Sequence, residues 1–167
     1  MGIKSSVARA CSRYVSLVLA ATTSACATQP ATDGARRTSV IEHVNLTDDW
    51  PYPFSAAVRA GNVLYLSGQL GTELKAGVPT LVDGGVEAET KQAMDNIQAL
   101  LVKCGSSLEQ VVECRVMLTD MKDWPALNAV YTKYFPGPKP ARSAWGVTAL
   151  ALGGHVEIAC LANAPAR

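Results

Sequence analysis

One strand-like stretch lying between two helix-like stretches constrains the fold of this chain more than any other feature. Residues 111–118 (VVECRVML) alternate between apolar and charged side chains with a period of two. Val112, Cys114, Val116 and Leu118 are expected on one face, with Glu113 and Arg115 on the other. This is the pattern of a half-buried strand. Such a strand must pair with others, and the neighbouring stretches supply helices to cover its apolar face.

Both neighbouring stretches show helical spacing. The first is predicted over 87–104, with Glu87 and Glu89 favourably placed in its first turn and Gly105 ending it. Its apolar positions are Ala93, Ile97, Leu100, Leu101 and Cys104. The second helix is predicted from Asp123 as N-cap, with Pro125 in its first turn, and the segment FPGPKP ends it. It carries Leu127, Tyr131 and Tyr134 at helical spacing.

Short strands are predicted at both ends of the folded body. Residues 41–46 and 56–68 give three strands, the last two forming a hairpin across Gly61-Asn62, whereas 71–85 is expected to be a surface loop. Two more strands are expected at 142–150 and 155–161. The order β-β-β-α-β-α-β-β predicts an α+β fold with both helices on one face of a single sheet. The other face would be apolar and uncovered, which predicts self-association.

Composition fits one globular domain and argues against nucleic acid as a partner. The chain has 167 residues, 49% hydrophobic and 17% charged, with 15 basic against 14 acidic residues. Without the three basic residues that precede residue 26, 12 basic residues face 14 acidic ones. No basic surface for phosphate backbones is indicated. The two histidines, His43 and His155, lack metal-ligand spacing, so no metal site is predicted.

The amino terminus has the pattern of a secretory signal. Residues 1–26 contain a basic stretch, an apolar run from Tyr14 to Ala21 that is too short to span a bilayer, and a small-residue exit. Ser24-Ala25 before Cys26 resembles a bacterial lipobox, in which Cys26 would be lipidated. An A-x-A cut at 25–27 would instead release a soluble exported protein, and MGIKSS also fits a myristoylation rule. Residues 27–38 are expected to be a linker, and the folded domain to span 39–167.

Three cysteines remain after Cys26: Cys104, Cys114 and Cys160. Their number is odd and no CxxC pair is present, so no disulfide framework is indicated and small core residues are expected. An oxidising compartment would still permit one bridge.

Four short motifs in order resemble the reactive-intermediate deaminase family, RidA or YjgF. They are Ser67-Gly68-Gln69, Asp95-Asn96-Ile97, Asn128-Ala129 with Tyr131, and Pro140-Ala141-Arg142-Ser143 followed by Val156-Glu157-Ile158. The resemblance covers about 40–164. It implies a chorismate-mutase-like fold, a homotrimer whose sheets form a central barrel, and active sites between subunits.

The resemblance also implies an activity. Family members hydrolyse enamines and imines to the keto acid and ammonia without a cofactor, so a 2-iminobutanoate/2-iminopropanoate deaminase-like hydrolase is expected. Arg142 would clamp the substrate carboxylate through two parallel hydrogen bonds, and Glu157 would orient or deprotonate water. The Ala144 backbone would contact the imine nitrogen, and Ser67 and Asn128 would line the site.

Two positions depart from the family pattern. Phe54 stands where many members have tyrosine, and Ala144 where many have cysteine. The main hypothesis is an exported, periplasmic deaminase, attached to a membrane only if Cys26 is lipidated. The rival is a non-catalytic trimer that binds small carboxylates or holds unfolding proteins.

Overall fold

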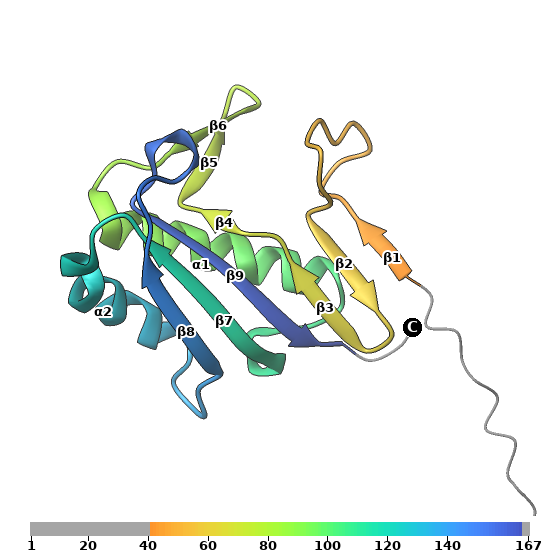
Figure 1. The fold of residues 1–167 in the computed structure, drawn as a ribbon. Helices are drawn as coiled ribbons and strands as arrows, with labels where there is room; N and C mark the ends of the chain where they lie inside the picture. Colours follow the sequence, from red (N-terminus) through yellow and green to blue (C-terminus); the bar gives the residue numbers. More distant parts are fainter. Residues whose placement is uncertain (1–40, 165–167) are drawn as a thin grey trace, which may run out of the picture. The chain divides into compact units, whose positions relative to one another are not determined.

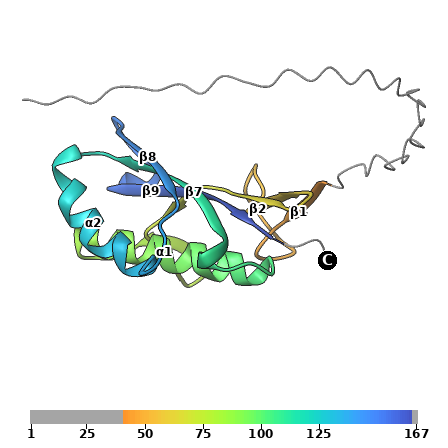
Figure 2. The ribbon, with the colours of Figure 1, turned by 90° about the horizontal axis from the view of Figure 1, so that it is seen from below.

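The computed structural model describes residues 41–164 as a seven-stranded mixed sheet with two α-helices on one of its faces, and a separate two-stranded sheet formed by β5 and β6 (Figures 1 and 2). The strands of the main sheet lie in the order β1-β2-β3-β9-β7-β8, and β4 also pairs with β9. Only β7 and β8 are parallel among these pairs. The strands are β1 (Ile41–Val44), β2 (Ala57–Ala60), β3 (Val63–Leu66), β4 (Gln69–Leu70), β5 (Thr72–Lys75), β6 (Val78–Leu81), β7 (Val111–Leu118), β8 (Ala141–Gly146) and β9 (Val156–Asn163). The helices are α1 (Gly85–Lys103) and α2 (Trp124–Tyr134).

The core lies between the sheet and the helices. The predicted apolar positions of α1 are buried, and they belong to one cluster with the inward side chains of β7 and β9. Gly105, at a φ of 73°, follows the last turn of α1, where a left-handed residue commonly ends a helix. The α+β class, the placement of both helices on one face, and the hairpin across Gly61-Asn62 are therefore confirmed.

The expected loop at 71–85 is wrong, because it contains a hairpin. Strands β5 and β6 pair through a turn in which Ala76 and Gly77 both have positive φ, a geometry suited to a tight hairpin. Leu74 and Val78 beside this turn are exposed. Because this hairpin buries no face, its side chains need not alternate between apolar and polar, and this alternation is the pattern that predicts a strand.

Strand β7 also differs from the expectation at one position. A register shift between Val111 and Glu113 places Val111 in the core and leaves Val112 59% exposed. A bulge inserts one extra residue and reverses the alternation beyond it. Asp123 makes no side-chain cap hydrogen bond; instead Asp120 accepts one from the Lys122 backbone at the preceding turn. The strand expected at 142–150 ends at Gly146.

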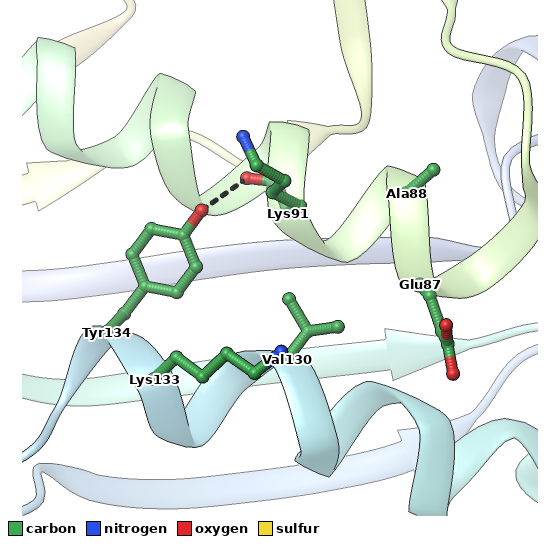
Figure 3. A pocket seen from close by; sticks show the side chains of 6 residues that line it. All are labelled: Glu87, Ala88, Lys91, Val130, Lys133 and Tyr134. Carbon is green, nitrogen blue, oxygen red and sulfur yellow. Dashed lines mark hydrogen bonds between the residues drawn. The ribbon is translucent and has the colours of Figure 1, made fainter.

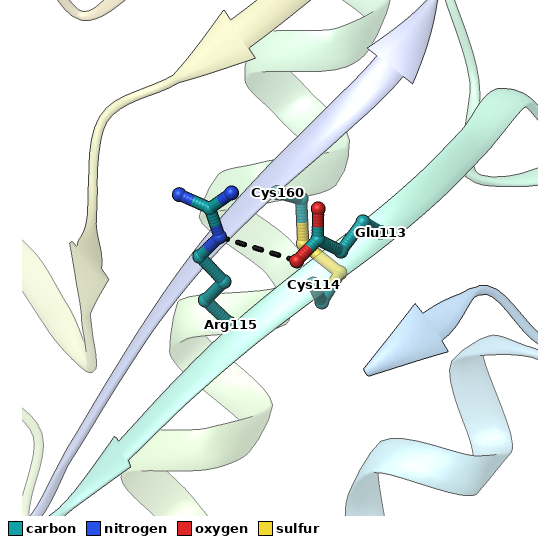
Figure 4. The surroundings of a disulfide bond; sticks show 4 residues. All are labelled: Glu113, Cys114, Arg115 and Cys160. Atoms are coloured by element: carbon teal, nitrogen blue, oxygen red, sulfur yellow. Dashed lines mark hydrogen bonds and ion pairs between the residues drawn. A yellow bond between two sulfur atoms is a disulfide. The ribbon is translucent and has the colours of Figure 1, made fainter. Parts of the chain in front are cut away.

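A disulfide joins β7 to β9, which corrects the expectation of unpaired core cysteines. Cys114 and Cys160 are direct partners in the antiparallel register and are bonded to each other (Figure 4). Both are fully buried on the helix-covered face. Cys104 is buried and lies outside this bridge.

The predictions for the amino terminus lie outside the described residues. They comprise the signal sequence at 1–26 with its lipobox cysteine, Cys26, and the linker at 27–38. Within 41–164, no helix is both long and apolar enough to cross a membrane.

Candidate active site

Arg142 lies on edge strand β8 and points to the helix-covered side of the sheet. Its guanidinium carbon lies 4.7 Å from the centre of the Tyr131 ring and 5.0 Å from that of Trp124. Both aromatic residues belong to α2, and stacking on their faces restricts the orientation of the guanidinium. Arg142 and Asn128 line one pocket of about 300 Å³. The structure therefore brings these two predicted site residues together.

Ala144 lies two residues after Arg142 on the same strand and so faces the same way. It is partly buried against the core. Trp145 points to the opposite face and is 42% exposed. Trp124 packs on the candidate carboxylate clamp, whereas Trp145 contributes apolar surface to the open face.

Glu157 lies on the open face of the sheet. Its neighbours Val156 and Ile158 on β9 are fully buried beneath the helices, so the side chain between them points the other way. A Cβ added to Gly68 would lie 1.8 Å from Glu157 Oε1. The carboxylate thus occupies the space left by the missing side chain of Gly68, between β3 and β4. Burial raises the pKa of Glu157.

Ser67 directly precedes Gly68, and Phe54 directly precedes Ser55, the residue to which Ser67 is hydrogen-bonded. The Ser67 hydroxyl donates to the backbone oxygen of Ser55 at 2.6 Å, which ties the segment containing Phe54 to the end of β3. Phe54 is 52% exposed and stacks on Tyr52 with ring centres 5.5 Å apart. A phenol ring therefore lies next to the position where the family pattern has a tyrosine.

The two predicted catalytic residues lie on opposite faces of one sheet. Arg142 shares the face of its register partner Cys114, and Glu157 shares that of Met117. The chain thus carries two separate groups: a clamp group around Arg142, with Asn128 and Ala144, and a base group around Glu157, with Ser67 and Phe54. A single copy does not bring them together.

Helix α1 holds both ends of the base group in place. Asn96 donates to the backbone oxygens of Leu70 (3.2 Å) and Thr72 (2.9 Å), which fixes β4. The buried carboxylate of Glu89 accepts from the His155 backbone N–H at 2.7 Å and contacts its ring at 2.6 Å, which fixes the start of β9. The hydrogen bond to Glu89 raises the pKa of His155.

A second, larger pocket lies between the two helices and holds no predicted site residue. It has a volume of about 430 Å³ and is lined by Glu87, Ala88, Lys91, Val130, Lys133 and Tyr134 (Figure 3). The Tyr134 hydroxyl bridges across it to the Lys91 backbone oxygen and the Asp95 carboxylate. Among residues 41–164, no group of three or more His, Cys, Asp or Glu side chains is placed to hold a metal.

Some residues that lie near the two groups are not indicated as such by the sequence. The sequence pattern predicts Tyr131 as a residue of the second helix and Lys139 as part of the segment that ends it, yet both line the Arg142 pocket. Aromatic residues occupy every second position of Trp50-Pro51-Tyr52-Pro53-Phe54, and this pattern is the sequence feature that indicates the aromatic cluster around Phe54.

Comparison with known proteins places this arrangement in a family. A family model described as Endoribonuclease L-PSP matches residues 49–164. A 2-iminobutanoate/2-iminopropanoate deaminase from Capra hircus is 44% identical over 110 residues, covering 66% of this chain and 79% of that protein. The protein of the same name from Mus musculus is 40% identical over 127 residues, covering 74% and 93%.

Two further relatives define the extent of the similarity. The chloroplastic Reactive Intermediate Deaminase A of Arabidopsis thaliana is 40% identical over 66% of this chain, which spans only 58% of the plant protein. The crystal structure of RidA from an Antarctic Psychrobacter superposes with a TM-score of 0.64 at 36% identity, covering 77% of this chain and 99% of that one. The chain therefore belongs to the Endoribonuclease L-PSP family, the RidA/YjgF family that its four ordered motifs indicate.

Proposed function

We propose that this protein hydrolyses small enamines and imines derived from amino acids to the keto acid and ammonia. The proposal rests on two side chains: Arg142, which stacks on Tyr131 in a pocket, and Glu157, whose partly buried carboxylate lies against Gly68. The relatives named 2-iminobutanoate/2-iminopropanoate deaminase support it. The reaction needs an anion clamp and a base for water, and the two groups supply one each.

The clamp group binds the substrate carboxylate. A guanidinium offers two parallel N–H donors that match the two oxygens of a carboxylate. Stacking against Tyr131 and Trp124 limits its rotation, so little conformational freedom is lost on binding. The substrate is thereby held with its imine carbon at a defined distance from the clamp.

The base group acts on water. Glu157 accepts a proton from water as the oxygen attacks the imine carbon, and the C=N π electrons move to nitrogen, which takes a proton. Glu157 then gives its proton to the amine nitrogen, the carbinolamine hydroxyl loses its proton to solvent, and the C=O bond forms as the C–N bond breaks, which releases ammonia and the keto acid. The raised pKa of Glu157 makes its carboxylate a better proton acceptor than one in bulk water. No cofactor takes part in this scheme.

The site is completed by a second copy of the chain, in a homotrimer. Within one copy the two groups point away from each other, so a substrate touching both must lie between subunits. The open face exposes Val63, Tyr65 and Trp145 (37%, 49% and 42%), which supports packing against another sheet. Light scattering of the purified protein is expected to give three times the monomer mass. A stable monomer at micromolar concentration would exclude a site between subunits.

We also propose that the protein is exported, and that Cys26 is lipidated. The buried disulfide supports export, because disulfides persist in oxidising compartments such as the bacterial periplasm. Fractionation of a bacterial host should find the wild type with membranes and Cys26→Ser in the soluble or unprocessed fraction. Identical soluble, cleaved behaviour of both proteins would favour the A-x-A cut.

An amino-acid oxidase assay tests the activity. The oxidase generates imino acids in situ, and the rate of ammonia and keto acid release is compared with and without this protein. Wild type should accelerate release, and Arg142→Lys should impair both binding and turnover because the charge remains but the paired donors are lost. Absence of acceleration on every imine tested would favour the carboxylate-binding alternative.

A further inference from the structure

The Arg142 pocket carries more positive charge than one substrate carboxylate can neutralise. Its lining residues are Asn128, Tyr131, Thr132, Lys139, Pro140 and Arg142, two of them cationic and none acidic. A carboxylate bound by the paired donors of Arg142 would leave the Lys139 ammonium in the same pocket of about 300 Å³ without an anion.

Lys139 is held at this pocket by its local sequence. Pro138 and Pro140 flank it, and proline fixes φ and restricts the residue before it. The ammonium group lies 3.5 Å from the Gly137 backbone oxygen, a long contact with an uncharged acceptor. The side chain is exposed and free to turn toward a ligand.

Tyr131 supplies a second and independent sign of a polar ligand. Its side chain lines the pocket and the residue is only 4% exposed, yet its hydroxyl has no hydrogen-bond partner within the described chain. Burial raises the pKa of Tyr131 to about 12, so the hydroxyl keeps its proton and remains a donor. A buried donor without a partner is costly, and a ligand oxygen would satisfy it.

We propose that the preferred substrate is a 2-imino dicarboxylate, the imine of an acidic amino acid. Arg142 binds the carboxylate next to the imine carbon, and Lys139 binds the distal carboxylate. The inference rests on the proposed function and adds the substrate class. Hydrolysis proceeds as above, with water adding to the C=N bond and ammonia leaving, and the distal carboxylate is unchanged.

Binding of two stable keto acids tests Lys139 separately from catalysis. The purified, processed protein is titrated by calorimetry with 2-oxoglutarate and with 2-oxobutanoate, of which only the first has a distal carboxylate. Wild type should bind 2-oxoglutarate roughly fivefold to tenfold more tightly, the size of one partly exposed charge pair. Lys139→Gln should abolish that preference and leave 2-oxobutanoate binding within about twofold.

Lys133→Gln is the matched control, because Lys133 is also an exposed lysine near this end of α2 but lines the other pocket (Figure 3). It should leave both affinities unchanged. Equal affinities of wild type for the two acids, an equal effect of both lysine variants, or no binding of either acid would overturn the inference.

A turnover assay then separates the two proposals. Imines of aspartate or glutamate and of alanine are generated by suitable oxidases, and Lys139→Gln should lower kcat/KM only for the dicarboxylates. Hydrolysis of all imines without a lysine effect would keep the deaminase and reject the dicarboxylate preference. A lysine-dependent binding preference without any hydrolysis would reject the deaminase and keep the ligand class.

Discussion

The two faces of the sheet differ in how they hold a charged side chain. On the covered face, Arg142 is fixed by neighbours that touch it, the rings of Tyr131 and Trp124. On the open face, the carboxylate of Glu157 lies in the space that a side chain on Gly68 would fill. Glu89, on the covered face, accepts a hydrogen bond from the His155 backbone and so holds the start of β9. Changes in packing should therefore alter the function of the clamp group, whereas added side-chain volume near Gly68 should alter that of the base group.

The largest effect is expected from removing the carboxylate on the open face. Glu157→Gln keeps the size of the side chain but not its basicity, and should slow imine hydrolysis by about 10²–10⁴-fold, as for a lost general base. Binding of a keto acid product, measured by calorimetry, should be largely intact. Hydrolysis at the wild-type rate would mean that Glu157 is not the base.

Breaking the disulfide tests how much this bond on the covered face contributes to the stability of the fold. A variant with Cys114→Ala and Cys160→Ala opens a link across 46 residues of sequence and should lower the free energy of unfolding by about 2–4 kcal/mol. Urea denaturation of the variant, with reduced and oxidised wild type as controls, measures this difference. Identical midpoints for reduced and oxidised wild type would argue against a bridge in the folded protein.

Filling the space beside Glu157 tests positioning on the open face. Gly68→Ala should lower kcat by roughly tenfold to hundredfold, because the added methyl group and the carboxylate cannot share one position. The unfolding midpoint should change little, since the clash is with the end of a flexible side chain. Gly137→Ala is the control, with nothing within 4 Å of its added Cβ. Equal activity of both variants would contradict the role assigned to Gly68.

The smallest effect concerns the ion pair behind the open face. The Glu89 carboxylate raises the pKa of His155, so the pair stabilises the fold below the unfolded histidine pKa of about 6.5. This contribution is lost as pH rises through the higher folded-state pKa. His155→Gln should therefore reduce stability at low pH and not at high pH, by urea denaturation, with His43→Gln as control. A deficit independent of pH would indicate packing and not charge.

Sequence reasoning succeeded where one pattern had one structural meaning. Apolar residues at helical spacing identified α1 and the core face of α2, and four ordered motifs indicated the family. It failed where the relevant signal was not periodic. The bulge at Val112 depends on hydrogen bonding between β7 and β9, and the Cys114–Cys160 bridge depends on a strand register that links residues 46 positions apart.

The candidate site shows the same division. Short motifs predict Arg142 and Glu157 as site residues, but the motifs do not say that the two side chains leave the sheet in opposite directions. That result follows from the register of β8, β7 and β9. Lys139 and Tyr131 entered the site only because the loop after α2 returns beside the helix to form a pocket.

Complementation between two inactive variants tests most directly whether the two groups meet across subunits. Arg142→Ala and Glu157→Gln are expressed together with different affinity tags, and mixed assemblies are isolated by sequential purification. If each site takes its arginine from one copy and its glutamate from a neighbouring copy, every mixed trimer holds one complete site in three, so the purified mixed assemblies should show about a third of wild-type imine hydrolysis. If mixed assemblies form and remain as inactive as either variant alone, the two groups do not form a site between subunits.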